Sequence, residues 1–429
     1  MFAISGRTGG KFISRAAMAA ALALGMAGGM AVTAAPALAK DAKPEPPKLS
    51  KAFTALAGPL QADIAKAKDQ AAAAALKDKV AAAMAAAQTP DDKFFAGQFA
   101  IQVGQTAKDN ALLRTGLETV IGSGKLAGAE LGKYNYFVGG MAFDAKDYVG
   151  ARTAFSNAVA AGYKENDVEA LLAETYFATN DLPKGMEQLN GAIAARKAAG
   201  AVAPKEWFIR GLSVAYKAKA YDAAFGFGAG LVEAYPSTDN WADAIGLART
   251  AGRFQAQETL DLMRLMDRTG SFRDTSDYAE YLQAADARRS PAEVLKVLDE
   301  GIKGGKLQAN DVFVTENRNV AQGRLAADKA SLPALERDAS AANATLATIM
   351  AAGDAFLSYD ESAKAEAFYK AALAKPGVDA DRALTRLGIA QVNQAKYAEA
   401  QATFAKVNGV RKPIAQLWGV FAGQKAKGG

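Results

Sequence analysis

The stretch from residue 387 to residue 407 reads LGIAQVNQAKYAEAQATFAKV and places one glycine, several alanines and two aromatic residues at helical spacing. Gly388 comes first, and Ala400 and Phe404 follow it in the second half of the stretch. This order predicts two helices that cross closely, because a glycine or alanine leaves room for an aromatic ring of the neighbouring helix. The same order occurs 35 residues earlier, at Gly353, Ala365, Tyr369 and Ala372.

A second pair of copies lies between residues 131 and 200, where the period is 34 residues. Small residues are matched by small ones and large residues by large ones almost throughout. The first copy has Val138, Gly139, Ala142, Tyr148, Ala151, Phe155 and Ala158, and the second has Leu172, Ala173, Tyr176, Leu182, Gly185, Leu189 and Ala192. Since a single helix pair cannot bury its apolar face alone, the period predicts stacked pairs.

This pattern resembles the tetratricopeptide repeat (TPR), a helix-turn-helix unit of about 34 residues. The resemblance implies an all-α fold, in which a right-handed TPR-like solenoid follows an N-terminal helical region. The period favours an open array over a closed toroid. The positions expected to pack the repeats are Gly139, Tyr148, Ala151, Phe155, Ala158, Ala173, Leu182, Gly353, Gly388, Tyr397, Ala400 and Phe404.

Outside the clear repeats, apolar residues still recur at helical spacing and no convincing strand pattern is found. Thr89-Pro90-Asp91-Asp92 and Ser290-Pro291-Ala292-Glu293 are typical helix starts, and the second has the form of a capping box. The alanine-rich run from residue 71 to residue 87 predicts one strong helix. Residues 307–342 fit no repeat unit.

The first forty residues have the composition of an export signal. Arg7, Lys11 and Arg15 precede an apolar stretch, and Ala37 and Ala39 are the small residues that signal peptidase requires. We therefore expect cleavage after Ala39 and a periplasmic protein without stable membrane insertion, rather than an uncleaved anchor. The predicted division is a signal peptide at 1–39, a Pro/Lys-rich linker at 40–50, the N-terminal helical region at 51–130, TPR-like repeats at 131–270, divergent helical pairs at 271–345, C-terminal TPR-like repeats at 346–421 and a basic tail at 422–429.

The composition excludes several catalytic mechanisms. The 429 residues include no cysteine and no histidine, which excludes disulfides, thiol nucleophiles, histidine bases and zinc sites built on those side chains. The formal net charge of +6 counts the three basic residues of the signal, so the remaining chain carries +3. It has no dense basic stripe, and Arg411, Lys412, Lys425 and Lys427 read as a solvated tail. We expect no nucleic-acid partner, no metal and no cofactor.

Three glycine-rich segments imitate phosphate loops but lack the required context. Residues 6–11 belong to the signal, and residues 122–125 lack both the first loop glycine and the magnesium-binding hydroxyl. Gly226, Gly228 and Gly230 follow a helix instead of a strand, so close helix packing explains them better. Carboxylates alone could support glycoside hydrolysis, and the candidate acids are Glu165, Glu169 and Glu174, or Asp267 with Asp274.

The most economical function is a non-catalytic scaffold of the bacterial cell envelope that binds a protein or peptide segment in a concave groove. The alternative is a carbohydrate-active hydrolase or a glycan-binding module on an α-helical superhelix. By carry-over from the groove-lining places of the TPR family, the partner-binding residues are expected to be Tyr136, Phe143, Asp144, Glu174, Phe177, Tyr216, Lys217 and Asn393.

Overall fold

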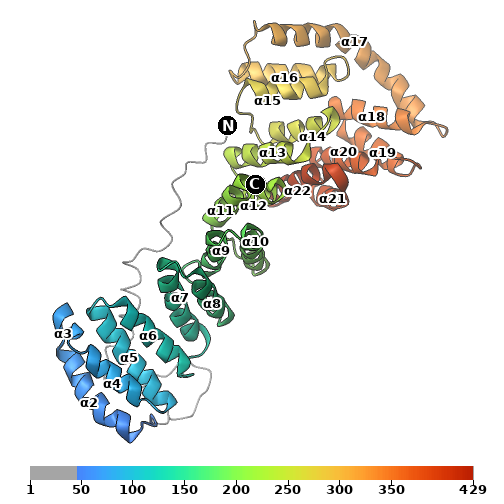
Figure 1. The fold of residues 1–429 in the computed structure, drawn as a ribbon. Coiled ribbons are helices and arrows are strands. Elements are labelled where there is room, and N and C mark those ends of the chain that lie inside the picture. Colours follow the sequence, from blue (N-terminus) through green and yellow to red (C-terminus); the bar gives the residue numbers. More distant parts are fainter. Residues whose placement is uncertain (1–45, 429) are drawn as a thin grey trace. The chain divides into compact units, whose positions relative to one another are not determined.

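The computed structural model describes residues 46–428, and within this range the chain is helical with short turns and no strand (Figure 1). The all-α fold class is therefore confirmed. The predicted signal peptide and most of the linker lie outside the described residues. Among the described helices, none is both long and apolar enough to cross a membrane. The chain divides into two compact units between Ala199 and Gly200, inside the segment predicted as one run of repeats.

The first unit begins with three helices that pack on a fourth. Phe53, Leu60 and Val80 are fully or almost fully buried there, in one cluster with residues of α5. The alanine-rich run is not one helix, as predicted, because it breaks into α3 and α4 with a turn between them. The helices of this unit are α2 (Lys51–Lys66), α3 (Gln70–Ala74), α4 (Lys77–Ala86), α5 (Pro90–Thr106), α6 (Asn110–Gly122), α7 (Gly128–Asp144), α8 (Tyr148–Ala160), α9 (Val168–Ala178) and α10 (Leu182–Ala198).

The start of α5 also fixes the end of the linker. Thr89 caps the backbone NH of Asp92, and the Asp92 carboxylate accepts from the backbone NH of Thr89, which confirms a helix start at this point. The backbone NH of Lys48 donates to Asp91 at 2.8 Å, and that of Ser50 donates to Asp92 at 3.0 Å. The final residues of the predicted spacer are thus held against α5.

The second unit contains the remaining helices. They are α11 (Lys205–Lys217), α12 (Tyr221–Ala234), α13 (Thr238–Gly252), α14 (Ala256–Arg268), α15 (Thr275–Ala285), α16 (Pro291–Lys303), α17 (Val312–Ser340), α18 (Leu346–Ser358), α19 (Ser362–Leu373), α20 (Ala380–Asn393), α21 (Tyr397–Phe404) and α22 (Lys412–Ala426), with the short 3₁₀ helix η2 (Gly409–Arg411) before α22. The 29-residue α17 occupies the stretch that fits no repeat and contains Pro333.

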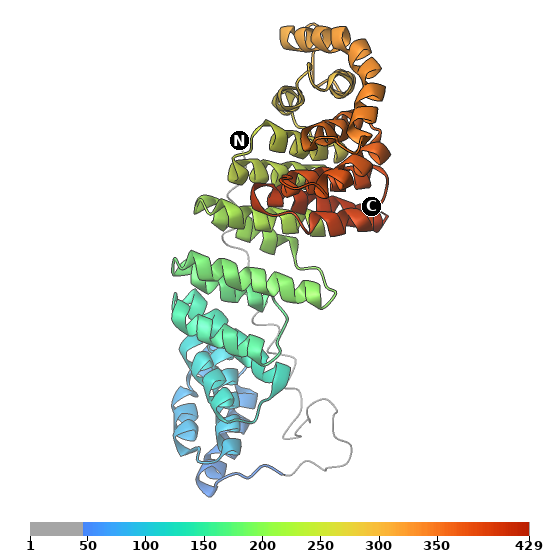
Figure 2. The ribbon, with the colours of Figure 1, turned by 90° about the vertical axis from the view of Figure 1, so that its right-hand side faces the viewer.

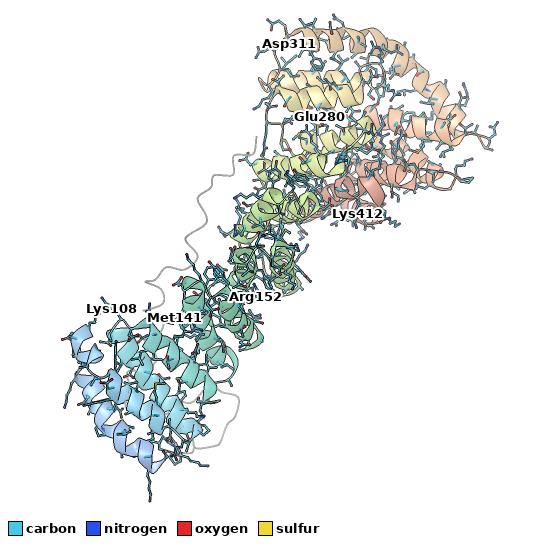
Figure 3. The ribbon with its side chains drawn as sticks, viewed as in Figure 1. Lys108, Met141, Arg152, Glu280, Asp311 and Lys412 are labelled. Carbon is cyan, nitrogen blue, oxygen red and sulfur yellow. The ribbon has the colours of Figure 1, made fainter. Side chains whose placement is uncertain are left out.

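One turn geometry recurs in six helix pairs, three in each unit. The first helix ends, a residue with positive φ follows two positions later, and the second helix starts two positions after that. Such a left-handed residue allows the chain to reverse within three residues. The positions are Lys108 (labelled in Figure 3), Lys146, Asn180, Lys219, Asp360 and Ala395.

Four helix pairs also share a glycine that faces an aromatic ring sixteen residues later. A Cβ atom on Gly388 would lie 2.5 Å from Cζ of Phe404, far inside van der Waals contact. These glycines therefore lie where two helices cross closely. Gly139, Gly353 and Gly388 were among the predicted packing positions, whereas Gly211 and Phe227 of α11 and α12 were not. The pairs are Gly139 with Phe155, Gly211 with Phe227, Gly353 with Tyr369, and Gly388 with Phe404.

The two ends of the second unit are in contact. The C-terminal helix α22 packs against α12, α13 and α14 as well as α20 and α21, and Figures 1 and 2 both show it beside them. Trp418 and Leu417 of α22 are fully buried. The expectation of an open array is therefore wrong for this unit, because the last helix covers the face of α12–α14 that an open array would leave free.

Candidate functional site: a charged pocket in the second unit

A buried aspartate joins α14 to the C-terminal part of the second unit. Asp261 of α14 is fully buried and accepts hydrogen bonds from Arg264 at 3.1 Å, Arg386 at 3.1 Å and Arg411 at 2.5 Å. Its backbone carbonyl accepts from the indole NH of Trp418 at 2.9 Å. The contacts to Arg386 and Arg411 span 125 and 150 residues of sequence.

These charges set the protonation state of Asp261. Burial alone would raise its pKa, but the positive charges of Arg386, Arg411 and Arg264 outweigh burial and hold the pKa below the ordinary value. Asp261 is thus an ionised carboxylate whose negative charge is shared by three guanidinium groups. The arrangement fixes α14 against α20 and η2. Two of its members, Arg264 and Trp418, also line the pocket described next.

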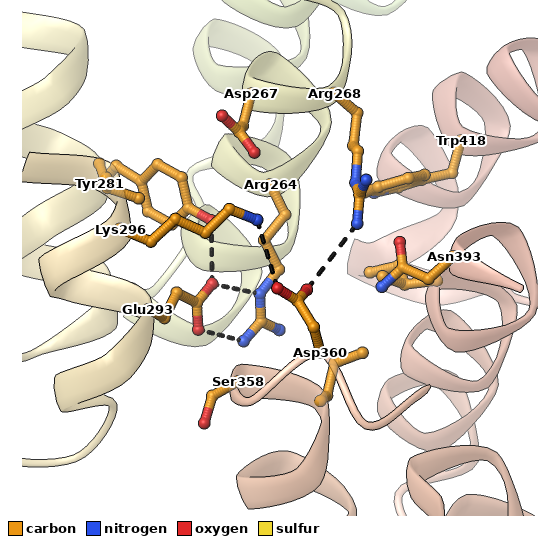
Figure 4. Close-up of a pocket in the computed structure, with 13 residues that line it drawn as sticks. Arg264, Asp267, Arg268, Tyr281, Glu293, Lys296, Ser358, Asp360, Asn393 and Trp418 are labelled. Atoms are coloured by element: carbon orange, nitrogen blue, oxygen red, sulfur yellow. Dashed lines mark hydrogen bonds and ion pairs between the residues drawn. The ribbon is translucent and has the colours of Figure 1, made fainter. Parts of the chain in front are cut away.

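The pocket lies inside the second unit and includes about 450 Å³ of empty space together with its open mouth. Six helices and the turn between α18 and α19 contribute to its lining, which is mostly charged and polar with a few apolar side chains between (Figure 4). Its lining consists of Arg264, Asp267, Arg268, Tyr281, Glu293, Lys296, Val297, Leu357, Ser358, Asp360, Ile389, Asn393 and Trp418.

The inner wall of the pocket is a closed ion-pair cluster. Glu293 of α16 binds Arg264 in a bidentate pair, with N to O distances of 2.7 and 2.8 Å, and its Oε1 accepts from the Tyr281 hydroxyl at 2.9 Å. Burial and the Glu293 charge raise the pKa of Tyr281 well above its ordinary value. The predicted capping box at Ser290 does not form, because Ser290 makes no side-chain cap and Glu293 is engaged with Arg264.

The mouth of the pocket carries a looser set of charges. Asp360, in the turn between α18 and α19, lies 3.4 Å from Nζ of Lys296 and 4.0 Å from a guanidinium nitrogen of Arg268. Its side chain is 62% exposed. The side-chain NH₂ of Asn393 donates to Ser362 at 3.2 Å, whereas its buried Oδ1 has no hydrogen-bond partner among residues 46–428.

One acid of the pocket, Asp267, has a raised pKa. Burial, followed by the charge of Glu300 and a hydrogen bond with it, raises the pKa of Asp267 to about 7, although Lys296 and Arg268 act in the opposite direction. A pKa near 7 means that Asp267 carries its proton for part of the time at physiological pH. The predicted companion of Asp267, Asp274, instead caps α15 and has a lowered pKa owing to Ser276.

Two of the expected groove residues are packing residues. Tyr136 is 7% exposed, and its ring lies against Phe137, Phe155 and Tyr163. Phe177 is also buried, with its ring against Gly185. The prediction that these two side chains line a groove is wrong, because both rings are buried between packed helices.

The other expected groove residues are at least partly accessible. Phe143 packs edge-on against Tyr148 and is half-buried, and Glu174 and Tyr216 are intermediate as well. Asp144 and Lys217 are exposed. Only Asn393 of this set lies in the pocket of the second unit.

The structure also places the other candidate acids and the predicted basic tail. Glu169 forms an ion pair with Arg196 at 3.2 Å, and Glu165 is exposed in a turn. Arg411 is buried against Asp261 and Glu258 and is not part of a solvated tail, and α22 extends to Ala426.

Sequence analysis missed Arg268, Lys296 and Asp360, which come from three separate helical segments. No local spacing links them, because the closure of the unit brings them together.

A scan of protein-family models finds no match, and a search of curated proteins finds none either. No cluster of three or more potential metal ligands exists within residues 46–428.

Proposed function

We propose that this chain is a non-catalytic protein-interaction scaffold of the bacterial cell envelope, exported to the periplasm by its N-terminal signal. Its helix pairs are TPR-like units, and the partner is a protein or peptide segment. The proposal requires neither a cofactor nor a metal.

The observation that carries the proposal is the repeated construction of the helix pairs. The same turn occurs in six pairs, and the same glycine-to-aromatic contact occurs in four of them. Tandem units of this kind present helix faces and turns at regular intervals, which suits recognition of an extended segment or a helix. The pocket of the second unit supplies polar groups on such a surface, including the unpaired acceptor of Asn393.

Crosslinking in intact cells tests the proposal. A photo-reactive residue at the exposed Glu361, next to Asp360 of the pocket, and another at the exposed Lys217 would be irradiated, and the products would be identified by mass spectrometry. Capture of the same protein from several independent cultures is the expected result. Recovery of no protein from either position, under conditions that capture known envelope complexes, would refute the scaffold function.

A carbohydrate-active hydrolase is the second candidate, and two observations favour it. The C-terminal helix α22 packs back on α12, α13 and α14, so the unit is closed in the sense expected of a helical toroid. Asp267, near the end of α14, lines the pocket and has a raised pKa. A general acid in a glycosidase needs such a pKa. Hydrolysis of purified peptidoglycan that is lost in Asp267→Asn but kept in Asp274→Asn would establish this activity in place of the scaffold.

A further inference from the structure

We propose that the pocket of the second unit binds the carboxylate of a peptide between Arg268 and Lys296, and that Asp360 occupies this place when no peptide is bound. The inference rests on the proposed function, because it names the chemistry by which a bound segment is recognised. The carboxylate belongs to an aspartate or glutamate side chain or to a chain end.

The first argument is the position of Asp360. The chain itself places a carboxylate between the two cations, which come from α14 and α16, and dashed lines in Figure 4 mark both contacts. At 4.0 and 3.4 Å the two distances are long for ion pairs, whereas Glu366 binds Lys396 at 2.8 Å. A loosely held and largely exposed carboxylate can be exchanged for another at low cost.

The second argument is charge balance. Arg264 is already matched by Glu293 and Asp261, and it has no charge to offer a ligand. Arg268 and Lys296 remain at the mouth, where they face Asp360, and Asp267 lies in the same pocket lining. A ligand carboxylate that replaces Asp360 preserves this balance, whereas a ligand cation would meet two positive charges.

The third argument is an unused hydrogen-bond acceptor. Oδ1 of Asn393 is buried in the pocket lining and has no partner within the described chain. A buried unpaired carbonyl is costly, and a peptide NH would satisfy it. Val297, Leu357 and Ile389 provide apolar surface for the carbon atoms of the same ligand. An amide NH close to a carboxylate is the chemistry of an acidic residue in a peptide.

The test uses small probes and the methyl NMR signals of Val297, Leu357 and Ile389. N-acetylglutamate N-methylamide, its glutamine counterpart and N-acetylglycine are titrated into the purified full chain. We expect the glutamate probe to bind about tenfold more tightly than the glutamine probe. Tighter binding of N-acetylglycine than of the glutamate probe would assign the site to a chain end. Equal binding of the glutamate and glutamine probes would overturn the proposal.

Variants separate displacement of Asp360 from a general charge effect. Asp360→Asn should tighten binding of the glutamate probe about two- to fivefold, the factor that corresponds to one exposed ion pair. The matched control is Asp338→Asn, which removes an equal charge from an exposed position on α17. The double variant Arg268→Gln/Lys296→Gln should abolish binding without loss of the folded methyl spectrum. Equal affinities for Asp360→Asn and its control would refute the displacement.

The outcome is separable from that of the scaffold function. If the glutamate probe does not bind while crosslinking in cells still captures a protein, the scaffold stands and the carboxylate site falls. If the probe binds as expected while crosslinking captures nothing, the pocket recognises carboxylates and the scaffold function falls.

Discussion

Replacing Gly388 by alanine should destabilise the second unit, and the contact with Phe404 explains the size of the effect. The new methyl group would lie 2.5 Å from the ring Cζ. The ring has little room to retreat, because Phe404 is 4% exposed and stacks on Trp418 at 6.3 Å between centroids. Overpacking of this kind costs about 1–3 kcal/mol.

Gly226→Ala provides the matched control. Gly226 lies in a helix of the same unit, is exposed, and has no atom within 4 Å of the place where a Cβ would stand. Both variants gain about 1 kcal/mol from the better helix propensity of alanine, so this gain cancels when they are compared.

We therefore expect Gly388→Ala to be about 1–3 kcal/mol less stable than Gly226→Ala in urea unfolding followed by circular dichroism. The cost of Phe404→Leu should be smaller in the Gly388→Ala background than in the wild type, because the smaller side chain admits the methyl group. Equal stabilities for the two alanine variants would refute the close-crossing role of Gly388.

Three further predictions concern the charged residues of the second unit. Arg386→Met should lower the free energy of unfolding by about 3–5 kcal/mol, because it leaves Asp261 buried with fewer partners. Urea unfolding of the variant and the wild type would measure this difference. The raised pKa of Asp267 means that the folded state holds a proton that the unfolded state has lost, so stability should fall as pH rises from about 4 to about 7. Asp267→Asn should remove this fall. Its free energy of unfolding relative to the wild type should therefore be about 2–4 kcal/mol more favourable at pH 8 than at pH 4, and an equal difference at both pH values would contradict the prediction. Burial would raise the pKa of Glu366, but its hydrogen bonds to Lys370 and Lys396 outweigh burial and lower the pKa to about 2. Acidification from pH 4.5 to pH 2 should therefore lower the stability of the wild type. Thermal melts should show that Glu366→Gln does not lose this stability.

Local pattern predicted the helix pairs well but not the closure of the second unit. The spacing from Gly388 to Phe404 lies within one helix pair, so the sequence shows both partners of the contact. Asp261 and Arg411 are 150 residues apart, and nothing in either neighbourhood marks the other. Arg411 consequently looked like a solvated basic residue.

Two residues of the candidate site, Asp267 and Asn393, were named from the sequence. Asp267 was one of the candidate acids for glycoside hydrolysis. Asn393 was carried over from the repeat pattern and lies in the pocket. Tyr136 shared the same kind of helical position, but its ring fills the space between helices. Side chains on one face of a helix divide between packing and solvent according to their neighbours, and a single sequence does not reveal those neighbours.

The placement of Asp261 also bears on how the protein folds. Arg386 and Arg411 follow Asp261 by 125 and 150 residues, so the buried carboxylate gains these two partners only when distant parts of the second unit come together. Contacts of such long sequence separation form late in folding. A chain that ends before residue 411 would also lack Trp418, whose indole binds the Asp261 carbonyl. The segment from Arg411 to Ala426 is therefore required to seal this unit, because it supplies both Arg411 and Trp418.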